Sequence, residues 1–341
     1  MAGTVLVTGG TGYIGGELID QLLERGWTVH TTVRSRAKSE TRLRGRWPAA
    51  GERLKIFEAV LMDDAGWAEA NAGCTHVAHV ASPFPMGIPK NADDLIVPAR
   101  EGTLRALRFA REAGVTRFVQ TSSAAAIAYG HGNREEFDES DWSNLDGPDA
   151  EPYIQSKTIA ERAARDWVAE NAPGMAFCSV NPVAVFGPVA NEDLSTSVEV
   201  LKRLVDGGMP MVPNVGIGVV DVRDVAKIHV LALEAPEDKV RGERFAASCR
   251  FMWVSEMAEI LRERLPEARA KKIPKRRMPG FMVSILAMFM PEMRQVKRNA
   301  GKRRDVSGAH VAEALGFTYI PADQTIVDTV DSLFDQGVVK S

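Results

Sequence analysis

Short apolar runs alternate with longer amphipathic stretches through the first half of the chain. The runs are rich in β-branched residues and lie near residues 4–8, 28–33, 54–60, 76–81, 117–121 and 175–180. Between them, apolar residues recur at helical spacing, as from Ile14 to Arg25. Strands that are apolar throughout, rather than at every second residue, indicate a parallel sheet buried on both faces. The pattern therefore predicts an α/β fold, a doubly wound parallel sheet.

A glycine-rich turn joins the first predicted strand to the first predicted helix. Its residues include Thr8, Gly9, Gly12, Tyr13, Ile14 and Gly15. We expect Gly9 to permit the tight turn, Gly12 to let the backbone approach a pyrophosphate, and Gly15 to allow close packing of helix on strand. The start of the helix then faces the anion. Strand, glycine turn and helix in this order predict a dinucleotide-binding domain of the Rossmann type.

A tyrosine and a lysine lie four residues apart at the start of another predicted helix, which runs from Tyr153 to about Asn171. Residues four apart on a helix share a face, so Tyr153 and Lys157 can converge. A nearby ammonium favours the phenolate and lowers the pKa of a tyrosine toward neutral pH, where it can donate or accept a proton. The alternative is a surface Tyr and Lys on an amphipathic helix, because this spacing is common.

Hydroxyl side chains end the apolar run near residues 117–121, where Ser122 and Ser123 follow Thr121. In an open parallel sheet, ligands bind outside the carboxyl ends of the strands. A hydroxyl there can hydrogen-bond a substrate carbonyl oxygen and stabilise the charge that develops on it. The alternative is that the hydroxyls only satisfy backbone groups at the strand end. The residues alone do not choose between the two serines.

Basic residues follow the second predicted strand, at the place where NAD enzymes generally carry an acid that binds the ribose hydroxyls. Arg34, Arg36 and Lys38 stand there instead. A guanidinium can form a forked contact with a 2′-phosphate and stack on adenine. We therefore expect NADP(H), bound by Arg34 with added charge from Arg36 or Lys38. The alternative is a solvated basic turn that tolerates either nucleotide.

Composition agrees with an enzyme of one large domain and a smaller lobe. The chain has 341 residues, of which 45% are hydrophobic, and a formal net charge of −3. Cys74, Cys178 and Cys249 show no C-x-x-C spacing, which argues against a disulfide framework and against a zinc site. Neither a metal nor a nucleic acid is expected as a ligand. The first strand begins at once, without the pattern of a signal peptide, so we expect a cytoplasmic protein.

The glycine turn, the serine and the Tyr-x-x-x-Lys pair resemble the extended short-chain dehydrogenase/reductase family. Further motifs resemble the branch of dihydroflavonol 4-reductase, cinnamoyl-CoA reductase and the microbial ketone and aldehyde reductases. These motifs lie at residues 77–83, 101–103, 121–123, 153–161, 181–182, 186–188 and 220–226. They span nearly the whole chain and, taken in this order, are specific for the family but not for a substrate.

The resemblance implies that Ser123, Tyr153 and Lys157 form a catalytic triad. Tyr153 would protonate the substrate carbonyl oxygen, Ser123 would hold that oxygen, and Lys157 would bind the nicotinamide ribose and tune Tyr153. The resemblance also places Pro182 and Val185 beside the nicotinamide. Ala81 and Ser82 would line the cofactor groove after the fourth strand.

Two positions depart from the family pattern. Val60 stands where relatives often carry an Asp that contacts adenine. Leu61 and Asp63 are the nearby candidates for cofactor contacts, and the sequence leaves open whether Asp63 replaces the missing one. Flavonoid reductases also have an Asn after the catalytic serine, whereas residues 124–128 here are four alanines and one isoleucine. A flavonoid substrate is therefore not expected.

The family's second lobe is discontinuous along the chain. We expect residues 1–182 and 219–235 to form the NADP-binding Rossmann domain, and residues 183–218 and 236–341 to form the substrate-binding lobe. The crevice between the lobes would hold the substrate. Candidate pocket walls are Phe84, Pro85, Met86 and Phe186, each with ordinary apolar packing as its alternative.

One segment of the second lobe is strongly basic. Arg269 to Arg304 contains twelve Lys or Arg residues and a single acid, Glu292, around an apolar stretch from Phe281 to Met290. The simplest interpretation is helices that pack their apolar faces and leave the cations in solvent. The alternatives are an anionic substrate tail, such as that of a CoA thioester, and a membrane surface. Membrane contact is the less favoured of these, and the segment is too short to span a bilayer.

Together these features predict an NADPH-dependent reductase. It would transfer hydride reversibly to a ketone or aldehyde of a medium-sized, aromatic or hydrophobic small molecule. One alternative keeps the fold but acts as an NAD-dependent epimerase, dehydratase or hydroxysteroid dehydrogenase. Another is a non-catalytic nucleotide sensor or scaffold. Relatives are monomers or homodimers, and the sequence does not choose between these states.

Overall fold

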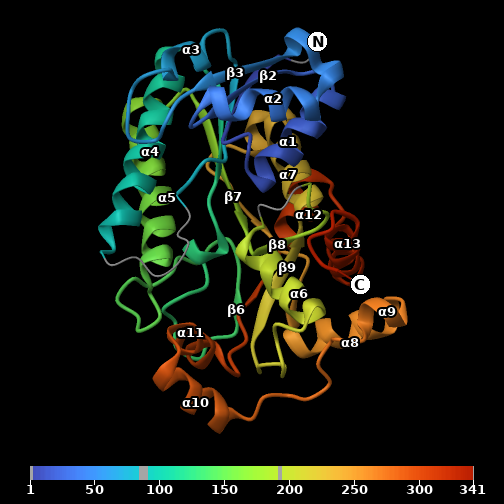
Figure 1. The fold of residues 1–341 in the computed structure, drawn as a ribbon. Coiled ribbons are helices and arrows are strands. Elements are labelled where there is room, and N and C mark those ends of the chain that lie inside the picture. Colours follow the sequence, from blue (N-terminus) through green and yellow to red (C-terminus); the bar gives the residue numbers. More distant parts are fainter. Residues whose placement is uncertain (1–2, 84–90, 191–193, 341) are drawn as a thin grey trace.

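A seven-stranded parallel sheet forms the centre of the larger lobe in the computed structural model, which describes residues 3–83, 91–190 and 194–340 (Figure 1). Its strands lie in the order β10 (Arg244–Ala247), β7 (Ala176–Pro182), β5 (Arg117–Thr121), β4 (His76–His79), β1 (Thr4–Thr8), β2 (Thr28–Val33) and β3 (Leu54–Glu58). Every neighbouring pair is parallel. The strand order reverses between β1 and β4, and such a switch point opens a crevice at the carboxyl ends of the strands. The predicted doubly wound sheet is confirmed.

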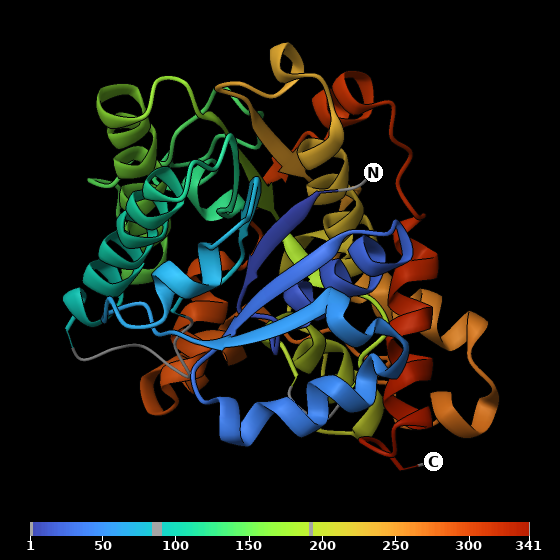
Figure 2. The ribbon, with the colours of Figure 1, turned by 90° about the horizontal axis from the view of Figure 1, so that it is seen from above.

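Helices cover both faces of this sheet (Figure 2). On one face lie α1 (Tyr13–Glu24), α7 (Val222–Glu234) and α12 (Ala309–Leu315). On the other face lie α3 (Trp67–Asn71), α4 (Asp93–Glu112) and α5 (Pro152–Asn171). Each layer contributes its own apolar cluster, with Leu18 and Ile228 in the first and Leu107 and Ala164 in the second. Burial on both faces explains why apolar residues such as Val5, Leu6 and Val7 of β1 follow one another without alternation.

The seventh strand, β10, comes from a segment that the sequence assigns to the second lobe. Its residues pair with β7, with Arg244 opposite Ser179 and Ala247 opposite Pro182. All four residues of β10 are buried. The strand is short, begins with an arginine and contains no β-branched residue, so its local sequence does not resemble a buried strand. Its position in the sheet depends on β7, which lies far away along the chain.

The smaller lobe contains a three-stranded sheet in the order β11 (Arg250–Trp253), β9 (Gly216–Asp221) and β8 (Ala184–Phe186). Strands β8 and β9 are parallel, whereas β9 and β11 are antiparallel. The helices of this lobe are α6 (Thr196–Asp206), α8 (Val254–Arg264), α9 (Glu267–Ala270) and α13 (Ala322–Asp335). A separate apolar cluster, which includes Phe186, Leu201, Met257 and Ile326, holds the sheet and these helices together.

Several short elements complete the fold. The strands β6 (Glu136–Phe137) and β12 (Asp305–Val306) form a two-stranded parallel pair. Helix α2 (Arg36–Arg46) follows β2, and the 3-10 helices are η1 (Pro48–Arg53), η2 (Ala124–Ala126) and η3 (Glu237–Lys239). Helix η2 begins directly after Ser123 and therefore turns the chain away from the carboxyl end of β5.

Helices α10 (Gly280–Phe289) and α11 (Pro291–Asn299) pack against each other at one end of the molecule (Figure 1). Only Val283 and Ala287 of α10 are buried, whereas Phe281 and Phe289 are 67% and 77% exposed. The expectation that the apolar side chains of this segment pack away from solvent is therefore met only in part. Among the described residues, no helix has both the length and the apolar character that a membrane span requires.

Candidate active site

The glycine turn leaves no room for larger side chains. Gly9 has a positive φ of 73°, and a Cβ atom there would lie 3.2 Å from Ala81. A Cβ on Gly15 would lie only 2.4 Å from the carbonyl oxygen of Gly9. The N–H of Gly12 donates to that same carbonyl at 2.9 Å. The turn therefore requires glycine at positions 9 and 15, because the chain folds back on itself at the carboxyl end of β1.

The start of α1 has the features of an anion site. The helix begins at Tyr13 without a side-chain cap in the described structure, and its first turn contains no acid. Its first N–H groups are therefore available, and they carry the positive end of the helix dipole. A pyrophosphate fits this donor set and the space that the glycines leave open. Thr8, Gly9, Gly12 and Gly15 lie together from the end of β1 to the first turn of α1.

The basic turn after β2 contains Arg36, which has an ion-pair partner, and Arg34, which has none among the described residues. Arg36 forms an ion pair with Glu40 at 2.8 Å, and its backbone N–H donates to Glu58 at 2.7 Å. Arg34 is exposed and has no hydrogen-bond or ion-pair partner within the described ranges, and the same holds for Lys38. A guanidinium without a partner at the end of β2 fits a 2′-phosphate. The described geometry therefore favours Arg34 and Lys38 over Arg36 as phosphate ligands.

His79, at the end of β4, supports the same groove, and sequence reasoning did not single it out. The Thr8 hydroxyl accepts a hydrogen bond from the N–H of Ala81 at 2.9 Å and is hydrogen-bonded to Nδ1 of His79 at 3.1 Å. Burial lowers the pKa of His79 to about 3, so the ring stays neutral. The histidine therefore fixes the loop that carries Ala81 and Ser82 against the glycine turn. Its only sequence signal is its place within the motif at residues 77–83.

Tyr153, Lys157 and Ser123 converge between α5 and the carboxyl end of β5. Proline at position 152 occupies the first turn of α5, and Tyr153 follows it. The Ser123 and Tyr153 side chains share a hydrogen bond. The Lys157 Nζ lies 6.0 Å from the centre of the Tyr153 ring, and the lysine is only 8% exposed. The helix thus brings the pair onto one face, as the four-residue spacing predicts.

The pKa values of these groups differ from the expectation that Lys157 lowers the pKa of Tyr153. Burial raises the pKa of Tyr153, and the hydrogen bond from Ser123 opposes this only in part. Burial also lowers the pKa of Lys157 to about 8, while the negative charge of Glu161 acts in the other direction. Burial is the largest influence on the pKa of Tyr153. Tyr153 is consequently a neutral phenol, which is a proton donor.

The two serines after β5 have different partners. Ser122 is 4% exposed, and its hydroxyl donates to Oε2 of Glu161 at 2.6 Å. Ser123 accepts a hydrogen bond from the N–H of Ala125 at 3.1 Å and contacts Tyr153. Ser122 is therefore held away from the crevice, and the geometry favours Ser123 as the group that meets a substrate oxygen. Glu161 itself was not recognised from sequence, although it lies four residues after Lys157.

The other residues that the sequence assigns to the cofactor site or the substrate pocket lie in different parts of the structure. The carbonyl oxygen of Pro182 accepts from Ser123 at 3.5 Å, so Pro182 borders the same crevice, and Val185 follows on β8. Asp63 lies exposed after β3 and caps the N–H of Ala65, while the Leu61 side chain packs against Gly102. Phe186 is fully buried in the apolar cluster of the smaller lobe. Phe84, Pro85 and Met86 lie outside the described residues.

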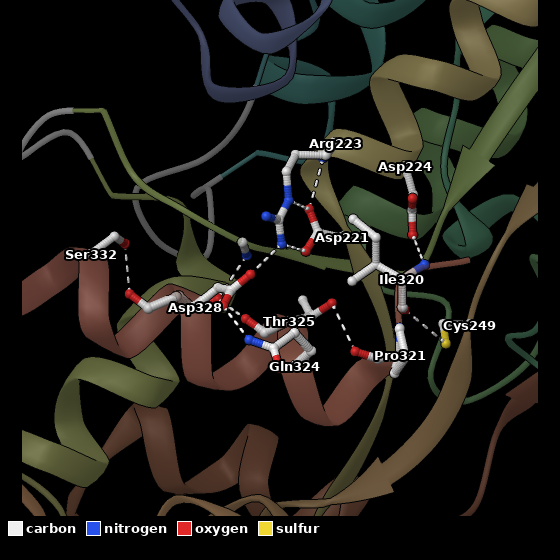
Figure 3. Close-up of polar contacts among 12 residues, drawn as sticks. Asp221, Arg223, Asp224, Cys249, Ile320, Pro321, Gln324, Thr325, Asp328 and Ser332 are labelled. Atoms are coloured by element: carbon white, nitrogen blue, oxygen red, sulfur yellow. Dashed lines mark hydrogen bonds and ion pairs between the residues drawn. The ribbon is translucent and has the colours of Figure 1, made fainter. Parts of the chain in front are cut away.

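Tyr13 connects the glycine turn to the smaller lobe. Its hydroxyl donates to the carbonyl of Gly187 at 2.7 Å, and the N–H of Gly187 donates to the Thr329 hydroxyl of α13 at 2.7 Å. Beside this contact, Arg223 bridges Asp221 and Asp328 at 2.7 and 2.6 Å (Figure 3). Helix α13 therefore fixes the end of β8 against α1, so the two lobes meet at the cofactor groove.

Two cations of the basic segment reach the start of α5, and both are paired with acids. Arg298 forms an ion pair with Glu151 at 2.7 Å, and Glu151 directly precedes α5. Arg304 forms an ion pair with Asp149 and lies over the ring of Tyr129. The charges of these arginines are thus balanced locally, close to Tyr153.

Comparison with known proteins identifies the family of this chain. A model of the NAD dependent epimerase/dehydratase family matches residues 5–247. Cinnamoyl-CoA reductase CAD2 of Medicago truncatula is 33% identical in an alignment of 355 positions, which covers 98% of this chain and 96% of that protein. Dihydroflavonol 4-reductase of Hordeum vulgare is 33% identical over 273 residues, which cover 78% of this chain and 76% of that protein.

Among solved structures, yeast methylglyoxal/isovaleraldehyde reductase Gre2 complexed with NADPH has a TM-score of 0.80 and 26% sequence identity. The match covers 98% of this chain and 100% of that one. The family resemblance predicted from the motifs is confirmed. The chain belongs to the NAD dependent epimerase/dehydratase family, the extended short-chain dehydrogenases/reductases.

Proposed function

We propose that this chain is an NADPH-dependent reductase that converts a ketone or aldehyde carbonyl to an alcohol, reversibly. The observation that carries the proposal is the convergence of Ser123, Tyr153 and Lys157 beside the crevice that the glycine turn opens. The relatives named reductases and the likeness to Gre2 with NADPH support the same reaction class.

Ser123, Tyr153 and Lys157 have different roles at the substrate carbonyl group. NADPH, when bound, supplies the hydride. Ser123 hydrogen-bonds the substrate oxygen, and Tyr153 donates its phenolic proton to that oxygen as negative charge develops on it. Burial raises the pKa of Tyr153, so the phenol keeps its proton until the substrate oxygen gains negative charge. The Lys157 ammonium stabilises the phenolate that remains after the proton transfer.

The preference for NADPH rests on the end of β2. The Arg34 guanidinium is exposed and lacks a partner among the described side chains, so a 2′-phosphate meets no competing ion pair there. Glu58 at the end of β3 is occupied by the N–H of Arg36. This arrangement supports a released NADPH/NADP couple over tightly held NAD, and hence a reductase over an epimerase.

The substrate that we propose is medium-sized, uncharged and aromatic or hydrophobic. Two arginines of the basic segment, Arg298 and Arg304, reach the start of α5, and both are neutralised by acids. Among the described residues, an anionic substrate tail therefore meets only paired arginines of the basic segment at the start of α5. The buried segment Ala124–Ala128 also offers no polar side chain next to Ser123.

The test is NADPH oxidation against aromatic aldehydes, α-diketones, β-keto esters, steroid ketones, flavanonols and acyl-CoA thioesters, with NADH in parallel. We expect turnover on simple carbonyls with NADPH preferred. Turnover confined to CoA thioesters would contradict the uncharged substrate. Purified protein that holds NAD and shows no net nucleotide consumption would instead support an epimerase, and nucleotide binding without any chemistry would support a sensor.

A further inference from the structure

A buried carboxylate lies behind the proposed catalytic residues. Glu161 is completely buried on α5, two turns after Tyr153 and one turn after Lys157. Its Oε2 accepts from the Ser122 hydroxyl at 2.6 Å and from Nδ2 of Asn181 at 2.7 Å. Residues 153, 157 and 161 recur every four positions and share one face of the helix. The same face thus carries the proton donor, the lysine and this carboxylate.

The second oxygen of Glu161 is equally occupied. Oε1 accepts from Nε of Arg244 at 2.7 Å, from the Ser179 hydroxyl at 2.9 Å and from Nε of Arg165 at 3.3 Å. The nearby positive charge of Arg244 holds the pKa of the carboxyl below its usual range despite the burial. Glu161 therefore remains an anion, which makes each of these hydrogen bonds charge-assisted.

Except for Arg165 on α5, the partners of Glu161 lie on or directly after three strands of the main sheet. Ser122 follows β5 and directly precedes Ser123, Asn181 on β7 directly precedes Pro182, and Arg244 opens β10. Asn181 also donates to the backbone carbonyl of Ser123 at 3.3 Å. One carboxylate on α5 is thereby connected to both strand ends that border the crevice.

We infer that Glu161 is a positioning residue, which holds the strand ends carrying Ser123 and Pro182 at a fixed place relative to Tyr153 and Lys157. This inference rests on the proposed reductase function. A buried ion pair contributes little net stability, because the loss of solvation offsets much of the attraction. We therefore expect the hydrogen bonds of Glu161 to control the geometry of the site. Displacements of reacting groups by well below the length of a hydrogen bond affect reaction rates strongly.

Replacement of Glu161 itself is a poor test, because Arg244 and Arg165 would lose their buried counter-charge and the fold would suffer. Two serines offer a matched pair of variants instead. Ser122→Ala and Ser179→Ala each remove one hydroxyl donor from Glu161, and Ser179 also accepts from Arg165 at 2.9 Å. Only Ser122 is adjacent to Ser123. The Ser179→Ala variant disturbs at least as many hydrogen bonds and serves as the control for stability.

The measurements are kcat and KM with NADPH and an accepted carbonyl substrate, the Kd of NADPH, and the Tm of each variant. We expect Ser122→Ala to lower kcat by about tenfold or more, with KM and Kd for NADPH within about twofold of wild type. Ser179→Ala should keep kcat within about twofold of wild type at a similar Tm.

Equal kcat values for the two variants, or a loss of kcat that follows Tm in both, would overturn the positioning role. This result is distinguishable from failure of the proposed function. If wild-type protein reduces no carbonyl substrate, the function itself is wrong; if wild type is active and Ser122→Ala is unaffected, only the role of Glu161 is wrong.

Discussion

The side chains of Ser123 and Tyr153 share a hydrogen bond across the gap between β5 and α5. Replacement of Tyr153 by Phe removes the proton donor but leaves the ring and its packing in place. We expect kcat to fall by at least about 100-fold, because the alkoxide that hydride transfer creates has no acid beside it. NADPH binding should persist, which fluorescence titration can measure.

A second, half-buried tyrosine provides the control for this variant. The Tyr319 hydroxyl lies 3.3 Å from the backbone carbonyl oxygens of Ala246 and Gly308, to which it can donate. Tyr319→Phe should change Tm but not the chemical step. Full turnover by Tyr153→Phe, or an equal loss in both variants, would remove Tyr153 from the catalytic role.

The preference for NADPH over NADH provides a test of Arg34 at the end of β2. Arg34→Asp should reverse or abolish the preference for NADPH, because an acid repels the 2′-phosphate and accepts hydrogen bonds from ribose hydroxyls. The ratio of kcat/KM for NADPH to that for NADH should fall by about 100-fold, a loss on the scale of one desolvated charged contact. Arg42→Asp on α2 makes the same change in charge at another exposed position. A ratio that is unchanged by Arg34→Asp, or equally changed by both, would mean that Arg34 is not the selector.

The pH profile should report Lys157. Its pKa is lowered to about 8, so its ammonium is present below pH 8 and lost as the pH rises through that value. Carbonyl reduction should therefore decline on the alkaline side, around pH 8, when kcat is followed under saturating NADPH. The titratable groups that act on this region are Tyr153 and Glu161 on α5 and His79 on β4, and the last stays neutral there.

The charge of Glu161 favours the ammonium, so Glu161→Gln should move this alkaline limb to lower pH. The profile of Ser122→Ala should keep the wild-type limb, since that variant retains the carboxylate. A limb at the same pH in Glu161→Gln, measured on protein shown to be folded, would mean that another group sets it.

The contribution of Asp224 to stability should change with pH in the opposite direction to that of an acid in a salt bridge. Asp224 is 3% exposed, accepts from the N–H of Ile320 at 2.8 Å and has its pKa raised to about 6 by burial (Figure 3). Between about pH 4 and 6, the folded state binds more protons than the unfolded state, so this group's contribution to stability falls as the pH rises. Asp224→Asn keeps the acceptor and removes the charge.

At pH 7 we expect Asp224→Asn to raise the free energy of unfolding, by at most about 3 kcal/mol. The difference from wild type should vanish as the pH approaches 4. Urea unfolding across this range measures both effects, and Asp335→Asn, at a residue 68% exposed, should leave stability nearly constant. A variant less stable than wild type at pH 7 would show that the carboxylate charge is stabilising.

Local patterns sufficed for the parts of the fold and site that form within one stretch of chain. The apolar runs give the first six strands of the sheet, and the glycine turn and the Tyr-x-x-x-Lys spacing each lie within one turn or helix. Glu161 could not be recognised in this way, because an acid on a helix ordinarily faces solvent. Its burial depends on Arg244, which is 83 residues further along the chain. The pKa of Tyr153 was likewise misjudged, since desolvation is a property of the packed site.

The late position of β10 in the chain affects how the protein is made. Before residue 244 has been synthesised, the nascent polypeptide already contains Ser123, Tyr153 and Lys157, but β7 still has an open edge and Glu161 lacks one of its two arginines. Unpaired strand edges on a growing chain invite association with other chains. Folding of the proposed active site is therefore coupled to the arrival of a four-residue segment from the second half of the polypeptide. A truncation before that point leaves the three proposed catalytic side chains without a finished sheet to hold them.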